Sequence, residues 1–129
     1  MMYRPALIAG SIFAALAVIT GAFGAHALKA ILPEPQLLVF ETGVRYQFYH
    51  SFALLVTGVA FLSFPYKNLK IATNLFIIGI LFFSGSLYVL PFLVVAGISP
   101  GIAGIITPVG GLLLIAGWVS FLSGIIRNK

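Results

Sequence analysis

The chain alternates between long apolar stretches and short segments that hold nearly all of its charged residues. The first apolar stretch lies between Arg4 and Lys29. A helix that crosses a bilayer needs about 20 predominantly apolar residues, so this stretch predicts a membrane span at about residues 5–27. Its start also resembles a secretory signal peptide, but it exceeds the roughly 7 to 15 apolar residues of such a signal. A retained helix is therefore favoured.

The segment that follows is more polar and contains two prolines. Pro33 and Pro35 interrupt residues 29–40, which we interpret as a short polar connection leading into an interfacial helical turn. A second span is expected at about residues 43–64. It ends where Pro65 and the lysines after it indicate a turn in water.

The remainder of the chain has no charged residue until its C-terminal arginine, which is too long a stretch for one helix. The glycines and prolines of residues 96–104 favour a turn that divides it. The two parts predict spans at about residues 71–94 and 107–126. We expect a bend at Pro91 and a place in the first helical turn for Pro108.

Four spans place both ends of the chain on one side of the membrane. Cytoplasmic loops carry an excess of Lys and Arg. The basic residues on the side of the termini are Arg4, Lys67, Lys70, Arg127 and Lys129, against Lys29 and Arg45, with Glu34 and Glu41, on the other side. We therefore predict an all-α membrane protein with four transmembrane helices in a compact bundle, both termini cytoplasmic, and a single domain over residues 1–129.

The composition strengthens the membrane prediction and reduces the kinds of binding and catalytic site that the chain can form. Of the 129 residues, 61% are hydrophobic and 7% are charged, whereas about 25% are charged in soluble domains. The net charge of +5 does not predict a nucleic-acid partner, because no basic run is present and basic residues at the ends of spans account for it. The chain has no cysteine, which excludes disulfides, thiolate nucleophiles and cysteine metal sites.

Half of the acidic residues and half of the histidines lie in "ETGVRYQFYH", residues 41–50. Glu41 and Arg45 are four residues apart, which favours an ion pair on one helix face. Tyr46 lies on roughly the opposite face with His50 and fits an interfacial aromatic belt. His50 is expected within membrane depth, where an ionisable group suggests a functional site. A neutral histidine hydrogen-bonded to a neighbouring helix is the simpler interpretation.

His26 lies near the end of the first span, on the side where the second span begins, so we expect the two histidines to approach. With Arg45, Tyr46 and Ser86 they form a candidate polar site near the outer half of the bilayer. Two imidazoles can ligate a haem iron, or with Glu41 a divalent cation. No metal-binding spacing accompanies them, so we assign neither metal nor cofactor. A proton relay is the other chemistry open to histidine.

Small residues at helical spacing predict close packing between helices, because small side chains let helices approach in lipid. The first span carries Ala17, Gly21 and Ala25 at four-residue spacing. Trp118 lies within the last span, where we expect it to pack and its indole N–H to need a partner. The last span also carries a stripe of Gly110, Gly117, Ser120 and Gly124.

Four ordered blocks of the chain resemble one family. These blocks are "GAFGAHALK" (21–29), "ETGVRYQFYH" (41–50), "FSGSLYVL" (83–90) and "ITPVGGLLLIAGW" (106–118). Together they resemble the DUF423 family, also called UPF0382. The resemblance implies a small multi-pass protein of the bacterial plasma (inner) membrane without an established molecular function, and it assigns no catalytic residue.

Three functions are open to such a chain. The preferred hypothesis is a non-enzymatic structural or accessory component of a membrane complex, because there is little chain outside the spans on which to build a soluble active site. Its expected partners are the lipid bilayer and either another copy or another membrane protein, and not nucleic acid. The alternatives are an oligomeric carrier or channel for a small solute, proton or lipid, and an intramembrane haem or metal protein.

Overall fold

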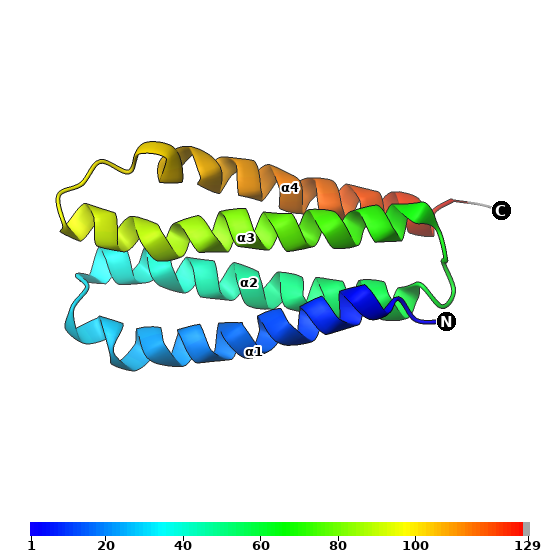
Figure 1. Ribbon diagram of the computed structural model, residues 1–129, viewed down its shortest axis with the longest axis horizontal. Helices are drawn as coiled ribbons and strands as arrows, with labels where there is room; N and C mark the ends of the chain where they lie inside the picture. Colours follow the sequence, from blue (N-terminus) through cyan, green and yellow to red (C-terminus); the bar gives the residue numbers. More distant parts are fainter. Residues whose placement is uncertain (128–129) are drawn as a thin grey trace.

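The computed structural model describes residues 1–127, in which four long helices are joined by short connections (Figure 1). Successive long helices run antiparallel, so the first begins and the last ends at the same end of the molecule (Figure 1). The elements are α1 (Arg4–His26), the 3-10 helix η1 (Leu28–Ala30), α2 (Glu34–Ala60), α3 (Lys67–Val95) and α4 (Gly101–Ile125). The predicted all-α class is confirmed.

Helix α2 begins earlier than the sequence pattern predicted. It starts at Glu34, whereas the second span was expected from about residue 43. Pro35 lies in the first turn of α2, where its missing N–H would have no helical partner in any case. The carboxylate of Glu34 is also favourable at a helix N-terminus. The interpretation of residues 29–40 as a connection leading into a helical turn was therefore only partly right, because the connection is shorter and residues 34–40 belong to α2 itself.

Helix α4 also begins earlier than predicted. It starts at Gly101, and Pro108 lies inside the helix rather than in its first turn. The predicted break at residues 96–104 is nevertheless present, shorter than expected. Gly97 and Gly101 have φ angles of 70° and 52°, a left-handed conformation that glycine adopts without steric penalty. These two glycines turn the chain from α3 into α4.

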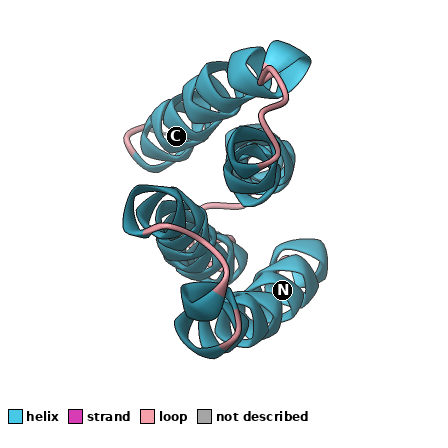
Figure 2. Ribbon diagram, turned by 90° about the vertical axis from the view of Figure 1, so that its left-hand side faces the viewer, coloured by secondary structure: helices cyan, strands magenta, loops and turns pink. Residues whose placement is uncertain are grey.

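The long helices form a staggered row and not the compact bundle that was predicted. Within residues 1–127, α2 packs extensively on α1 and α3, α3 packs on α4, and α1 touches α3 only slightly. The end-on view shows α1, marked N, and α4, marked C, at opposite ends of the row (Figure 2). The row stays open because, in the described residues, α1 and α4 do not pack appreciably on each other.

Small residues bring neighbouring helices close together, as predicted for α4. A Cβ added at Gly117 would lie 2.7 Å from the Phe76 ring of α3, and one at Gly110 would meet the backbone of Phe83. The prediction for α1 was only partly right, since Ala17 is buried but Ala25 is exposed. The buried small residues of α1 are Ala6, Gly10, Ala17 and Gly24, which follow a period near seven and face α2.

Buried apolar side chains form two clusters. The larger joins α2, α3 and α4 through Leu54, Phe76 and Leu114. The smaller lies at the turn between α1 and α2, where Leu28 and Phe40 pack together. The two clusters anchor the row at its middle and at one end.

Three helical segments of the described chain are long and apolar enough to cross a membrane: residues Arg4–Ala30, Lys67–Val95 and Gly101–Ile125. These correspond to three of the four predicted spans. Helix α2 is not among them, because it carries the polar block around Arg45 together with two glutamates.

Candidate functional site

His50 is buried in the middle of the row, and both of its ring nitrogens have partners. Its Nε2 accepts a hydrogen bond from Nε1 of Trp118 at 3.2 Å. Its Nδ1 lies 2.7 Å from the carbonyl oxygen of Tyr46. An indole can only donate, so Nε2 carries no proton and Nδ1 donates to the carbonyl. His50 is therefore held as one neutral tautomer. This agrees with the simpler of the two sequence interpretations, a neutral histidine hydrogen-bonded to a neighbouring helix.

The bond between His50 and Trp118 joins α2 to α4 across α3. The Phe76 ring of α3 packs against both rings, with its centroid 5.8 Å from that of His50 and 5.2 Å from that of Trp118. The indole N–H of Trp118 thus has the partner that the sequence predicted. This contact ties together two helices that are not neighbours in the sequence.

Gln47 is a central polar residue that the sequence analysis did not single out. Its Nε2 donates to the carbonyl oxygen of Phe13 in α1 at 2.9 Å. Its Oε1 accepts from the hydroxyl of Tyr88 in α3 at 2.7 Å. A glutamine inside a largely apolar helix is itself a signal, because a polar group in lipid needs a partner. One buried amide therefore links three helices.

Two serines of the block "FSGSLYVL" make further links between helices. Ser84 donates to the carbonyl oxygen of Gly43 in α2 at 2.7 Å. Ser86 lies 2.7 Å from the hydroxyl oxygen of Thr107 in α4 and also donates to the carbonyl oxygen of Phe83. Ser86, a predicted site residue, therefore binds α3 to α4, and its recorded partners do not include the histidines.

The predicted approach of His26 to His50 does not occur. His26 is exposed in the last turn of α1. In that part of α1, Gly24 faces Phe40 of α2, whereas His50 lies next to Ser51, which faces Gly10 near the other end of α1. The helices are antiparallel, so the histidines lie at different heights along the row. The sequence placed both on one side of the membrane but could not give the register between α1 and α2.

The other predicted site residues of α2 are exposed, as for Arg45 and Tyr46, or half-buried, as for Glu41. Arg45 and Glu41 form no ion pair within 4.0 Å in the described part of the chain, and Arg45 instead donates to the Thr42 hydroxyl at 3.4 Å. Tyr46 stays close to His50, with ring centroids 6.1 Å apart, and packs against Phe83. Of the six predicted residues, the structure therefore brings Tyr46 and His50 together. Glu41 and Arg45 share the lining of a second hollow without forming an ion pair.

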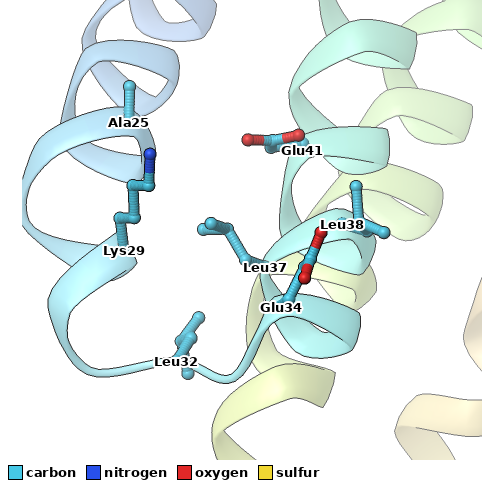
Figure 3. A pocket seen from close by; sticks show the side chains of 7 residues that line it. All are labelled: Ala25, Lys29, Leu32, Glu34, Leu37, Leu38 and Glu41. Atoms are coloured by element: carbon cyan, nitrogen blue, oxygen red, sulfur yellow. The ribbon is translucent and has the colours of Figure 1, made fainter.

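A charged hollow of about 540 Å³ lies between α1 and α2 where η1 connects them. Lys29 extends into it from the α1 side, and Glu41 extends from α2 toward the same space (Figure 3). Glu34 lies lower on the α2 side (Figure 3). Ala25, Leu32, Leu37 and Leu38 complete the lining.

A second hollow of about 250 Å³ adjoins the first and shares Glu41 with it. Gly21 and Gly24 of α1 form part of its lining, together with Phe40 and Arg45 of α2. Across residues 1–127, no group of three or more His, Cys, Asp or Glu side chains is placed to hold a metal ion.

Comparison with known proteins agrees with the architecture and the predicted resemblance. The family model described as "Protein of unknown function (DUF423)" matches residues 20–111. No solved structure matches the chain.

Relatives of similar length carry membrane-protein names. The chain is 42% identical to the UPF0382 membrane protein YwdK of Bacillus subtilis, over 94% of this chain and 95% of the relative. It is 36% identical to the UPF0382 inner membrane protein YgdD of Escherichia coli, over 96% and 88%. A UPF0382 membrane protein of Haemophilus influenzae is 38% identical over 87% and 86%. The predicted inner-membrane location is confirmed, and the chain belongs to the DUF423, or UPF0382, family of membrane proteins of unknown function.

Proposed function

We propose that this chain crosses the inner membrane four times, with both termini in the cytoplasm, and acts without catalysis as an accessory component of a larger membrane complex. The observation that carries this proposal is the state of its buried polar groups. Within the described residues, every buried side-chain nitrogen and oxygen atom has a hydrogen-bond partner. Gln47, His50 and Ser84 use their polar atoms to join helices to one another, which is the role of a structural element. The other buried hydroxyls bond mainly to carbonyl groups of their own helix.

The position of α2 supports a fourth span. Its 27 residues correspond to about 40 Å of helix at ~1.5 Å per residue, longer than the ~30 Å hydrocarbon core of a bilayer. It lies between α1 and α3, both of which are apolar enough to span. Its most buried polar residues, Gln47 and His50, are satisfied by those neighbours and by α4. An α2 span fits because its neighbours cover the groups that lipid would penalise.

The free surface of α1 supports a protein partner within the membrane. Ser11, Ala15 and Ala22 are exposed and lie along one stripe of the helix surface, away from the buried face of α1. Helix association in lipid depends on close packing through such small residues. The outer helices of the row thus offer faces on which another helix could pack.

The geometry lends less support to the two alternative functions. A carrier that works through His50 would have to free a ring whose two nitrogens are already bonded. A haem held by two histidines would need His26 and His50 to meet, and they lie at different heights along the row. The accessory role requires no rearrangement.

Photocrosslinking in native membranes tests the accessory role. A photoreactive residue at position 15 is expected to give a covalent adduct with a protein, because Ala15 lies on the proposed contact face. The matched position is Phe82, which is exposed on α3 and is expected to react with lipid alone. Replacement of Ala22 by Trp should abolish the adduct at position 15 while leaving the melting temperature of the purified protein unchanged, since Ala22 is exposed.

The identity of the adduct distinguishes a second copy of this chain from another membrane protein. Absence of any protein adduct at position 15, together with a monomeric protein in mild detergent, would contradict the proposed accessory role.

A further inference from the structure

We infer that the charged hollow between α1 and α2 binds the headgroup of a phospholipid that carries a primary ammonium, of the phosphatidylethanolamine class. In this arrangement Lys29 contacts the lipid phosphate, and Glu34 and Glu41 accept hydrogen bonds from the ammonium. The hollow, at about 540 Å³, lies within the roughly 300 to 1,000 Å³ range of small-molecule sites. The inference rests on the proposed membrane placement.

Lys29 and Glu41 extend toward a shared space, Glu34 lies lower on the α2 side, and the three charged groups form no ion pair with one another among the described residues (Figure 3). Among residues 1–127, Lys29 forms no ion pair with Glu34 or Glu41 within 4.0 Å, although all three line the same hollow (Figure 3). A group that carries a positive and a negative charge a few bonds apart can contact both signs at once. A zwitterionic headgroup has this distribution.

The lining favours a primary ammonium over a quaternary one. Carboxylates recognise an ammonium through its N–H donors, which choline lacks, and choline sites are typically built from aromatic rings. None of the seven residues that line the hollow is aromatic. An anionic headgroup without an amine would satisfy Lys29 but leave the two carboxylates facing a negative charge. Ethanolamine therefore fits better than choline or glycerol.

The surroundings favour a lipid over a soluble molecule with the same headgroup. The hollow lies at the end of α1, a helix that is apolar enough to span the membrane, so it is placed at the lipid–water boundary. The second hollow continues from it along α1 and α2, lined by Gly21, Gly24, Phe40 and Val44 and also by the charged residues Glu41 and Arg45. The start of an acyl chain can follow its apolar side while the headgroup stays among the charges.

The test measures lipid binding by the purified full-length protein in mild detergent, without any partner. Phosphatidylethanolamine, phosphatidylcholine and phosphatidylglycerol with identical acyl chains are added in turn. Retained lipid is counted by native mass spectrometry, and the melting temperature is recorded, since a ligand that binds the folded state raises it. The ethanolamine lipid is expected to be retained preferentially and to raise the melting temperature most.

Three variants locate the binding site. Glu41→Gln and Lys29→Gln are each expected to lower affinity for the ethanolamine lipid roughly tenfold, the order of one charge-assisted hydrogen bond. Lys67→Gln is the matched control, because Lys67 is exposed at the opposite end of the molecule. It should bind like the unaltered protein. If Glu41→Gln does not fold, Lys29→Gln still decides the question.

Equal retention of the three lipids, or unchanged affinity in Lys29→Gln, would overturn the inference. Soluble phosphoethanolamine that competes as well as the lipid would overturn the assignment to a lipid. If the protein binds the lipid but is monomeric in mild detergent and gives no protein adduct at position 15, the lipid inference stands and the accessory role fails. If the protein gives the adduct at position 15 but shows no preference for the ethanolamine lipid, the lipid site fails and the accessory role stands.

Discussion

At the scale of single residues, the interior of this protein is organised by a few polar side chains that each join two or three helices. Gln47 contacts α1 and α3, and His50 contacts α4. The sequence predicted that Trp118 and His50 would need partners, because hydrocarbon cannot satisfy an N–H or an imidazole. It could not pair them with each other, since the two residues are 68 positions apart.

A double-mutant cycle on His50 and Trp118 measures their bond directly. Trp118→Phe, His50→Leu and the double variant are expected to give a coupling of about 0.6 to 1.7 kcal/mol in the free energy of unfolding, the range for hydrogen bonds between membrane helices. Unfolding in mixed micelles, followed by circular dichroism, provides the measurement. Tyr49→Phe serves as control because Tyr49 is exposed. A coupling near zero would show that this contact contributes only packing.

At the scale of elements, the seam between α3 and α4 depends on the absence of side chains on α4. Gly110, Gly117 and Gly124 each lie where a Cβ would press against α3. The near seven-residue spacing of these glycines predicted the seam, because that spacing keeps them on one helix face. Helix starts were predicted less well. The sequence predicts an interruption at Pro35 and a place in a first helical turn for Pro108, yet Pro35 lies in the first turn of α2 and Pro108 lies inside α4.

Alanine substitutions distinguish glycines at the seam between α3 and α4 from helical glycines that contact no other helix. Gly110→Ala is expected to destabilise the protein by about 1 to 3 kcal/mol, the usual result of overpacking, because its Cβ would meet the Phe83 backbone. Gly85→Ala should be neutral or stabilising by up to ~1 kcal/mol, since a Cβ at this position would have no neighbour within 4 Å. Thermal unfolding in detergent provides the comparison. Equal losses in the two variants would contradict the proposed seam.

At the scale of the whole molecule, the open row leaves most of α1 and α4 in contact with their surroundings. The start of α1 and the end of α4 lie at the same end of the row (Figure 1), as an even number of spans requires. The unequal distribution of basic residues then predicts which end faces the cytoplasm. An open row also explains why so small a protein can offer two broad apolar faces while keeping its polar groups covered.

Cysteine accessibility tests the proposed orientation, and the cysteine-free chain suits it. Single cysteines replace Ala30, Ile98 and Ser63, which are exposed in the connections. A membrane-impermeant maleimide added to intact cells should label positions 30 and 98. Position 63 should react only after the inner membrane is permeabilised. Labelling of position 63 alone in intact cells would show that the orientation is the opposite of the one proposed. Labelling of all three positions in intact cells would contradict four spans.

The sequence pattern was enough to establish the helical class, the membrane setting, three helices long and apolar enough to cross a membrane, and the family. These depend on the length of apolar stretches and on ordered local motifs, both of which can be read along the chain. The register between neighbouring helices, and whether the four helices close into a bundle, could not be predicted from the sequence pattern. Whether His26 meets His50, whether Glu41 pairs with Arg45, and whether four helices close or form a row depend on how one helix slides and turns against the next. That choice is made by contacts between distant residues, such as Ser51 beside Gly10 and Gln47 bonded to Tyr88.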